Sequence, residues 1–193
     1  MVTVIEVPLF PLHTVLFPGG PLPLRIFEPR YLAMVSECLR SDTEFGVVLI
    51  TQGGETGEAA AGHEVGCLAR IIDWDQGDDG LLAVRAIGTR RFRVRSRRVE
   101  ARQLVRAEVE LLAAPPPQPV PGRYREQADW VAGVLPKLEH YRGITPEDDA
   151  AWLAWRLAEL LPIKPSQRQT LLEMNDPQAA LARVVRFIEP AAD

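Results

Sequence analysis

The chain has 193 residues, enough for one large domain or two small lobes, and its 47% apolar and 25% charged residues exclude a disordered chain. The net charge of −4 argues against a general nucleic-acid-binding protein, and two cysteines, Cys38 and Cys67, are too few for a disulfide framework or a zinc site. No apolar run approaches the ~20 residues of a membrane span, and prolines interrupt the first twelve residues where a signal peptide would lie, so we expect a cytoplasmic protein.

The first thirty-one residues are apolar but rich in proline. Residues 2–7 alternate weakly and predict an edge strand. Six prolines then lie between Pro8 and Tyr31. Each proline removes a backbone donor and fixes φ, so the segment cannot be a helix interior or a central strand. The pattern predicts an ordered, extended and turning path with large apolar side chains held at intervals.

One helix and several strands follow. Glu28 precedes Pro29, as at a helix start, and apolar residues at helical spacing predict a helix over residues 29–40. Residues 51–62 are rich in Gly and Ala and predict a mobile loop, while residues 75–80 end in Asp-Asp-Gly, which is typical of a hairpin. Strands are expected at residues 45–50, 65–74, 81–87, 91–99 and 104–112. Such short strands favour a barrel or a folded-over sheet.

The composition changes at Ala113. Residues 113–122 are rich in proline and predict a stiff linker between a β-rich lobe, residues 1–112, and a helical lobe, residues 123–193. In the second lobe we expect a helix over 124–141 with a kink at Pro136, a helix over 145–161 capped by Thr145, and a short helix over 166–174. A last helix follows Asp176, with an apolar stripe at Leu181, Val184, Val185 and Ile188. The fold class is therefore α+β.

The proline-rich opening resembles the N-terminal substrate-binding domain of Lon proteases. That family reads Leu-Pro-Leu-Phe-Pro-Leu, a Pro-Gly turn, Leu-Pro-Leu and Phe-Glu-Pro-Arg-Tyr, and the matching residues here are 7–12, 17–19, 22–24 and 27–31. The resemblance covers nearly the whole chain, strongly to about Val94 and weakly after it. It implies a β-rich, PUA-like pseudo-barrel lobe followed by a helical bundle lobe, and a module that recognises unfolded or specific protein segments.

The sequence lacks the motifs of an ATPase or a protease. A phosphate-binding loop needs a Gly-Lys pair, which occurs nowhere in the chain, and residues 53–57 are glycine-rich but contain no lysine. Ser166 lies two residues from Lys164, yet it stands where a helix N-cap is expected rather than a nucleophile. The three histidines are scattered. We therefore predict a standalone binding module with no catalytic residue, metal or cofactor. A separate ATPase or protease is named as a candidate partner, a membrane is not, and no oligomeric state is predicted.

Two sets of residues in the opening segment are candidates for binding. An apolar groove for extended peptide is predicted at Leu16, Phe17, Leu22, Ile26 and Phe27. Glu28, Arg30 and Tyr31 are the polar residues with the clearest need for fixed partners. On the structural interpretation, Glu28 accepts hydrogen bonds at the helix start and Arg30 ties the helix to a strand.

A basic stripe forms the remaining candidate. Nine arginines and one acid lie between Arg85 and Arg106. Strand alternation predicts that four of them share one face, namely Arg91, Arg93, Arg95 and Arg97. One interpretation is a PUA-like RNA-binding surface. The other, which we favour, is a solvated face whose arginines pair with neighbouring acids such as Asp73, Asp75 and Glu108, so nucleic acid is not expected as a partner.

Overall fold

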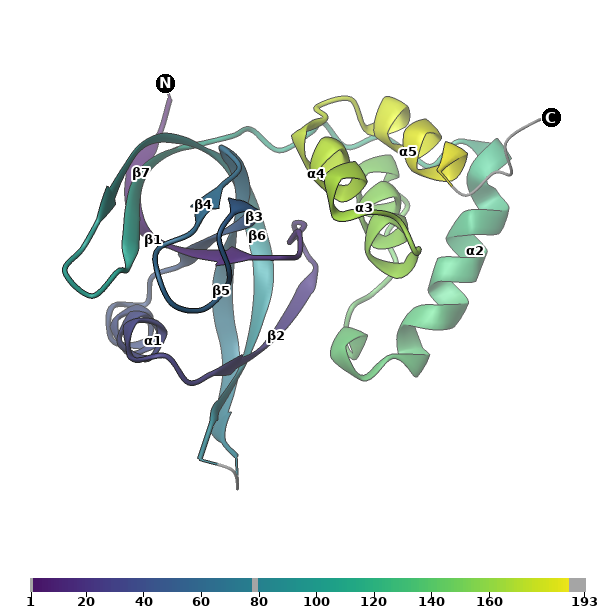
Figure 1. Ribbon diagram of the computed structural model, residues 1–193. Coiled ribbons are helices and arrows are strands. Elements are labelled where there is room, and N and C mark those ends of the chain that lie inside the picture. The colour runs from purple at the N-terminus through teal and green to yellow at the C-terminus, as the bar shows by residue number, and fades with distance from the viewer. Residues whose placement is uncertain (1, 78–79, 188–193) are drawn as a thin grey trace. The chain divides into compact units, whose positions relative to one another are not determined.

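The chain divides into two compact units, Met1–Ala113 and Ala114–Asp193, and each is described by itself. The structure is a computed structural model and describes residues 2–77 and 80–187 (Figure 1). Within these residues the first unit is rich in strands and contains one α-helix, whereas the second is helical. The α+β class predicted from the sequence is confirmed.

Five strands of the first unit form a closed ring. The order β1–β7–β6–β5–β3 is completed by a parallel pairing of β3 with β1. Two further strands lie outside the ring, with β4 paired to β3 and β2 paired to β6. The strands are β1 (Val4–Leu12), β2 (Pro21–Ile26), β3 (Phe45–Gln52), β4 (Ala61–Gly62), β5 (Val65–Gln76), β6 (Leu82–Val99) and β7 (Val105–Leu111).

Prolines do not keep the opening segment out of the sheet. Strand β1 extends to Leu12 and contains Pro8 and Pro11. It pairs with β7 up to Leu9 and with β3 from Leu9 onward, so each proline has a strand partner on one side only. A missing N–H then breaks no ladder on the other side. The prediction that this segment cannot form a central strand is therefore wrong for β1, which lies between β7 and β3.

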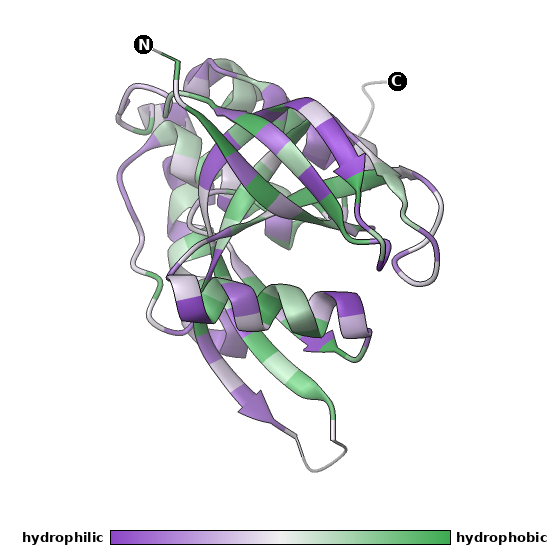
Figure 2. Cartoon of the chain, turned by 90° about the vertical axis from the view of Figure 1, so that its left-hand side faces the viewer, coloured by the Kyte–Doolittle hydropathy of each residue, from purple (hydrophilic) through white to green (hydrophobic). Residues whose placement is uncertain are grey.

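The core of the first unit lies between the strands and α1 (Pro29–Ser41). The buried face of α1 packs in the larger apolar cluster through Tyr31, Met34, Val35 and Cys38. A second cluster, around Phe92, fills the ring between β1, β3, β6 and β7. Figure 2 shows hydrophobic and hydrophilic residues alternating along the strands, as expected where one face is buried.

Two strands that were predicted separately form one continuous strand in the structure. The strands predicted over 81–87 and 91–99 are both part of β6, which begins at Leu82 and is continuous through Gly88. A Cβ at Gly88 would lie 2.1 Å from the carbonyl oxygen of Phe17. Glycine at this position therefore allows the turn at residues 17–20 to pack on the strand rather than marking a break in it. The predicted hairpin residues Asp78 and Asp79 lie outside the described residues.

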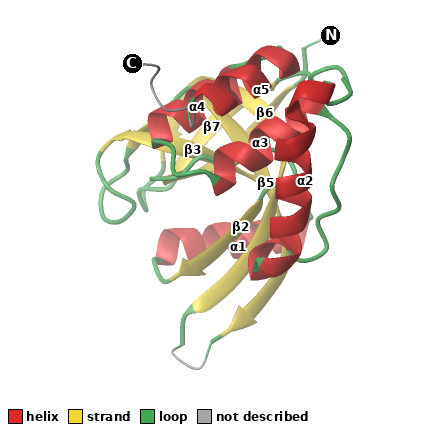
Figure 3. Ribbon diagram, turned by 90° about the vertical axis from the view of Figure 1, so that its right-hand side faces the viewer, coloured by secondary structure: helices red, strands yellow, loops and turns green. Residues whose placement is uncertain are grey.

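The second unit contains four α-helices in the described residues (Figure 3). The predicted helix over 124–141 stops at Val134 and is followed by two short 3-10 turns, because Pro136 cannot continue the α-helical ladder. The helix expected from Thr145 begins at Ala150, where Asp149 accepts a hydrogen bond from the N–H of Trp152. The four helices are α2 (Arg125–Val134), α3 (Ala150–Leu160), α4 (Pro165–Glu173) and α5 (Pro177–Arg186).

The last two helices start at different kinds of residue. Asp176 caps α5 by accepting from the N–H groups of Gln178 and Ala179, in agreement with the prediction. Helix α4 begins at Pro165 with Lys164 at the N-cap, so the prediction that Ser166 is the cap is wrong. In α5 the apolar stripe is buried at Leu181, Val184 and Val185, and its fourth member, Ile188, lies outside the described residues.

Candidate functional site

Phe27 joins strand β2 to helix α1 and is held outward by both. Side chains alternate along a strand, so Ile26 is buried in the core while Phe27 remains 57% exposed. The helix begins at Pro29, which has no N–H to satisfy in the first turn. Regular structure on each side of Phe27 therefore fixes an exposed aromatic ring at this corner.

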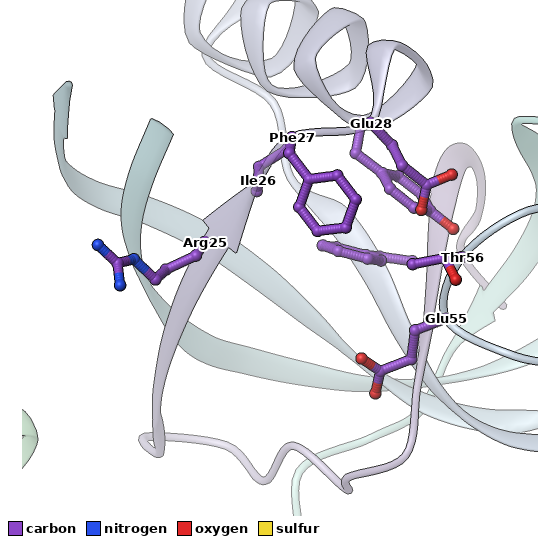
Figure 4. Close-up of a pocket in the computed structure, with 8 residues that line it drawn as sticks. Arg25, Ile26, Phe27, Glu28, Glu55 and Thr56 are labelled. Carbon is purple, nitrogen blue, oxygen red and sulfur yellow. The ribbon is translucent and has the colours of Figure 1, made fainter. Parts of the chain in front are cut away.

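A cavity of about 60 Å³ opens beside the Phe27 ring. Figure 4 shows the side chains of Phe27, Glu28 and Thr56 gathered at this cavity, whereas the guanidinium of Arg25 points away from it. The lining mixes apolar and polar side chains, and it is made by Phe10, Arg25, Ile26, Phe27, Glu28, Tyr31, Glu55 and Thr56. A ligand that contacts the exposed Phe27 ring could therefore also place an apolar group in the adjoining cavity.

The polar residues of the helix start stabilise this corner. Arg30 is 4% exposed and forms an ion pair with Glu28 at 3.0 Å. Its Nη1 donates to the carbonyl oxygen of Gln103 at 3.0 Å, so Arg30 connects the helix to the turn between β6 and β7. The Glu28 carboxylate makes no cap hydrogen bond to the helix, so the predicted capping role of Glu28 is wrong.

Tyr31 forms the floor of the same corner. Its ring stacks on Phe10 with 4.0 Å between the ring centroids, and the guanidinium of Arg30 lies 4.6 Å from the Tyr31 ring centroid. Burial raises the pKa of the Tyr31 hydroxyl above its ordinary value. Tyr31 therefore acts as a packing residue with a neutral ring, in line with the expectation that it has fixed partners.

The glycine-rich loop predicted to be mobile is attached to this corner. The Glu55 carboxylate accepts a hydrogen bond from the N–H of His13 at 2.7 Å, and Glu28 accepts one from the N–H of Gly57 at 3.4 Å. The N–H of Ala59 donates to the side chain of Gln103 at 3.2 Å. Sequence reasoning missed Glu55 and Thr56, because the residues with which they line the cavity lie far away in the chain and leave no local pattern.

Four of the five residues predicted to line an open groove are buried. Leu16, Phe17, Leu22 and Ile26 expose 6% or less of their surface, and Phe17 exposes none. They seal the barrel instead, because Leu22 and Ile26 lie on the inner face of β2 and the turn at Phe17 packs on β6. The prediction of an open groove is therefore wrong for these four, and Phe27 is the member that offers surface.

The four arginines of the predicted basic stripe do not share one face. A bulge between Val94 and Ser96 shifts the register of β6 against β7, which reverses the side-chain alternation beyond it. Arg91 is buried, and its Nη2 donates to the carbonyl oxygen of Ala113 at 3.3 Å. Burial lowers the pKa of Arg91.

Several exposed arginines of this region have partners among the described residues, whereas the exposed Arg93 forms no ion pair there. Arg95 forms an ion pair with Glu110, and the Nη2 of Arg97 donates to the carbonyl oxygen of His63 at 2.7 Å. Arg85 pairs with Asp73 at 3.4 Å, one of the pairings that the solvated-face interpretation anticipated. The contacts therefore support that interpretation over a nucleic-acid surface.

Residues weighed for catalysis have structural roles. The N–H of Lys164 donates to the side chain of Gln167 at 2.8 Å, and the carbonyl oxygen of Ser166 accepts from the hydroxyl of Thr170 at 3.0 Å. Among residues 2–77 and 80–187 no group of three or more His, Cys, Asp or Glu side chains is placed to hold a metal ion. None of the helices described there is long and apolar enough to cross a membrane.

The helical unit contains a buried charge that the sequence did not reveal. Arg156 is fully buried in α3, and its Nη2 contacts the Glu159 carboxylate at 2.8 Å. The hydroxyl of Tyr141 donates to the same carboxylate at 3.0 Å. Burial raises the pKa of Glu159 to about 7. The i, i+3 spacing of Arg156 and Glu159 on an apolar helix was the available signal.

Comparison with known proteins places these features in a family. The family model of the substrate-binding domain of the ATP-dependent protease La (LON) matches residues 6–189. The Lon protease of Phenylobacterium zucineum (strain HLK1) is 27% identical over 195 residues, which cover 92% of this chain and 24% of that protein. The Lon protease of Roseiflexus castenholzii is 27% identical over 193 residues, 94% of this chain and again 24% of that protein. The chain thus spans about a quarter of these relatives.

Two solved structures have the same fold. A crystal structure of a Lon N-terminal domain protein from Xanthomonas campestris is 38% identical, covers 96% of this chain and 99% of its own, and has a TM-score of 0.77. The N-terminal domain of a Mycobacterium avium complex Lon protease is 15% identical with a TM-score of 0.65, a likeness of fold alone. The resemblance seen in the opening residues is confirmed, and the chain belongs to the Lon substrate-binding domain family.

Proposed function

We propose that this chain binds extended, apolar segments of other proteins, and that Phe27 with the adjoining cavity is the contact surface. The observation that carries the proposal is the exposed Phe27 ring, held by β2 and α1 beside a cavity lined by both apolar and polar side chains. A rigid aromatic group next to a pocket is the usual centre of a protein-recognition surface. The family description, a substrate-binding domain, supports the same function.

The details of the architecture and of the partners also belong to this proposal. We assign the β-rich unit to the PUA-like pseudo-barrels, which the closed ring of β1, β7, β6, β5 and β3 supports. The helices after Ala114 are assigned to a bundle lobe. Two statements stay predictions. One is that a separate ATPase or protease receives the bound segments, and the other is that this module works without an ATPase or protease in the same chain.

An affinity measurement tests the proposed contact surface. Slightly more than half of the Phe27 ring remains to be buried, which is worth about 1.5 kcal/mol, so Phe27→Ala should weaken binding of a neutral, unfolded apolar peptide by roughly tenfold. The matched control is Leu39→Ala, which removes an exposed apolar side chain of helix α1 that does not line the cavity. Thermal unfolding of each variant shows what fraction is folded. Equal affinity of folded wild type and folded Phe27→Ala would refute the proposal.

A further inference from the structure

Strand β5 has an open edge in its second half. Its first half pairs with β3, but only at residues 67–69. Residues 70–76 pair with β6 on one side and have no strand on the other among the described residues. An unpaired strand edge presents N–H and C=O groups that can bond to an added strand.

The other outer strand of this region is protected, and β5 is not. Strand β2 pairs with the opposite side of β6, and Pro21 and Pro23 occupy alternate positions in it. Alternate prolines remove the donors from the outer side of a strand, which is a common protection against unwanted pairing. No proline occurs in residues 70–76. The outer edge of β2 therefore lacks two of its donors, whereas that of β5 lacks none.

The register shows which backbone groups of β5 point outward. Pro21 and Pro23 have no N–H and so occupy positions that do not bond to β6. Leu24 therefore exchanges hydrogen bonds with its partner Val84, which leaves Val84 none for β5. The partner of Val84 on β5 is Trp74. The N–H and C=O groups of Trp74 consequently point toward the open edge.

Two hydrogen bonds agree with this direction. The N–H of Gly77 donates to the carbonyl oxygen of Leu81 at 2.9 Å, which makes Gln76, like Trp74, an outward-pointing residue by alternation. The N–H of Trp74 donates to the carboxylate of Asp73 at 3.0 Å instead of to β6. A carbonyl oxygen of an added strand can replace the exposed Asp73 carboxylate as the acceptor of this N–H.

The side chains beside the edge define the chemistry of its ligand. Trp74 and Ile72 are 56% and 54% exposed, so apolar surface is available next to the open backbone groups. Two ion pairs lie along this part of the strand, Arg70 with Glu44 at 3.2 Å and Asp73 with Arg85 at 3.4 Å, and their charges offset one another. Asp75 adds a further carboxylate, so the edge combines apolar contacts with one negative charge among the described residues.

We propose that the β5 edge at residues 70–76 binds an extended protein segment in which apolar or aromatic residues alternate with lysine or arginine. The segment adds as a strand, its apolar side chains contact Trp74 and Ile72, and a basic side chain lies near Asp75. A second copy of the chain fits less well, because the Asp75 carboxylates of two such edges would repel each other. The proposal rests on the proposed function in that the ligand is a protein segment, but it uses a separate surface.

Fluorescence anisotropy with the full chain tests the proposal. The probe is a labelled ten-residue peptide of alternating Val and Lys, compared with a peptide in which Glu replaces each Lys. Trp74→Ala should weaken binding of the basic peptide by about tenfold, by loss of the apolar contact. Gln76→Pro, which removes an outward donor as Pro21 and Pro23 do in β2, should weaken it by about threefold to tenfold. Trp130→Ala, at an exposed tryptophan of the helical unit, is the control and should bind as wild type.

Hydrogen exchange provides the second readout. The basic peptide should slow exchange at the Trp74 and Gln76 amides, because an added strand bonds to outward-pointing groups. Wild-type affinity in both Trp74→Ala and Gln76→Pro, equal binding of the acidic peptide, or a wild-type dimer that Gln76→Pro dissociates would each overturn the proposal. Comparison with Phe27→Ala separates the two proposed surfaces. If Phe27→Ala loses binding of the neutral peptide while the β5 variants bind the basic peptide as wild type does, only the β5 proposal is refuted. If the β5 variants bind their peptide more weakly while Phe27→Ala binds the neutral peptide as wild type does, only the Phe27 proposal is refuted.

Discussion

Replacing Gly88 by alanine tests how the proline-rich opening is held against the barrel. A Cβ at this position would lie 2.1 Å from the carbonyl oxygen of Phe17 and 2.9 Å from its carbonyl carbon. Both are backbone atoms, so the turn at residues 17–20 must move away from β6. Gly88 also donates its N–H to the carbonyl oxygen of Gly20 and accepts from the N–H of Gly19, each at 2.8 Å. A shift of the turn weakens both hydrogen bonds.

The expected loss of stability in Gly88→Ala follows from these contacts. Two weakened hydrogen bonds cost about 1 kcal/mol each, and overpacking adds about 1–3 kcal/mol, so the free energy of unfolding should fall by roughly 3–5 kcal/mol. Urea unfolding followed by circular dichroism measures this difference. The control is Gly54→Ala in the same unit, whose Cβ would approach no atom closer than 3.6 Å. A Gly88→Ala variant as stable as Gly54→Ala would refute this account of the turn.

Two further predictions concern the helical unit. The Glu159 carboxyl has a pKa of about 7 against an ordinary value of 4.5, so the folded state binds its proton more tightly than the unfolded state does. The free energy of unfolding should therefore fall by up to about 3 kcal/mol as the pH rises from about 4.5 to 7. Glu159→Gln should flatten this pH dependence in denaturant titrations at several pH values. Asp149→Ala removes acceptors from the N–H of Trp152 at 2.8 Å and that of Gln118 at 3.0 Å, and should lower the free energy of unfolding by about 1–3 kcal/mol. An unchanged midpoint in Asp149→Ala, or a wild-type pH slope in Glu159→Gln, would contradict these expectations.

The sequence was sufficient where local signals decide the structure. Helix α1 lies where Pro29 and the apolar spacing placed it, and α5 starts at the capping residue Asp176. The positions of most strands followed from their apolar runs. Signals of this kind involve residues within one or two turns of each other, so one sequence reveals them.

The errors arose where distant residues decide. Pro21 and Pro23 are compatible with a strand because β2 is an edge, which depends on pairing with β6 more than fifty residues away. Phe17 is buried because Gly88 allows its turn to approach. The predicted arginine stripe is wrong because a bulge in β6 changes the side-chain alternation, and only the register with β7 reveals that bulge. For the same reason the sequence identified Phe27 as a candidate but not the Glu55 and Thr56 side chains beside it.

Mapping a bound peptide on the protein tests the central claim most directly. Backbone amide shifts of the full chain would be recorded by nuclear magnetic resonance while a neutral, unfolded apolar peptide is added. We expect the largest changes at Phe27, Glu28 and Thr56, which surround the cavity, and little change at Leu39 on the exposed face of α1. Saturable binding with no change at Phe27, Glu28 and Thr56 would contradict the assignment of the contact surface to this corner.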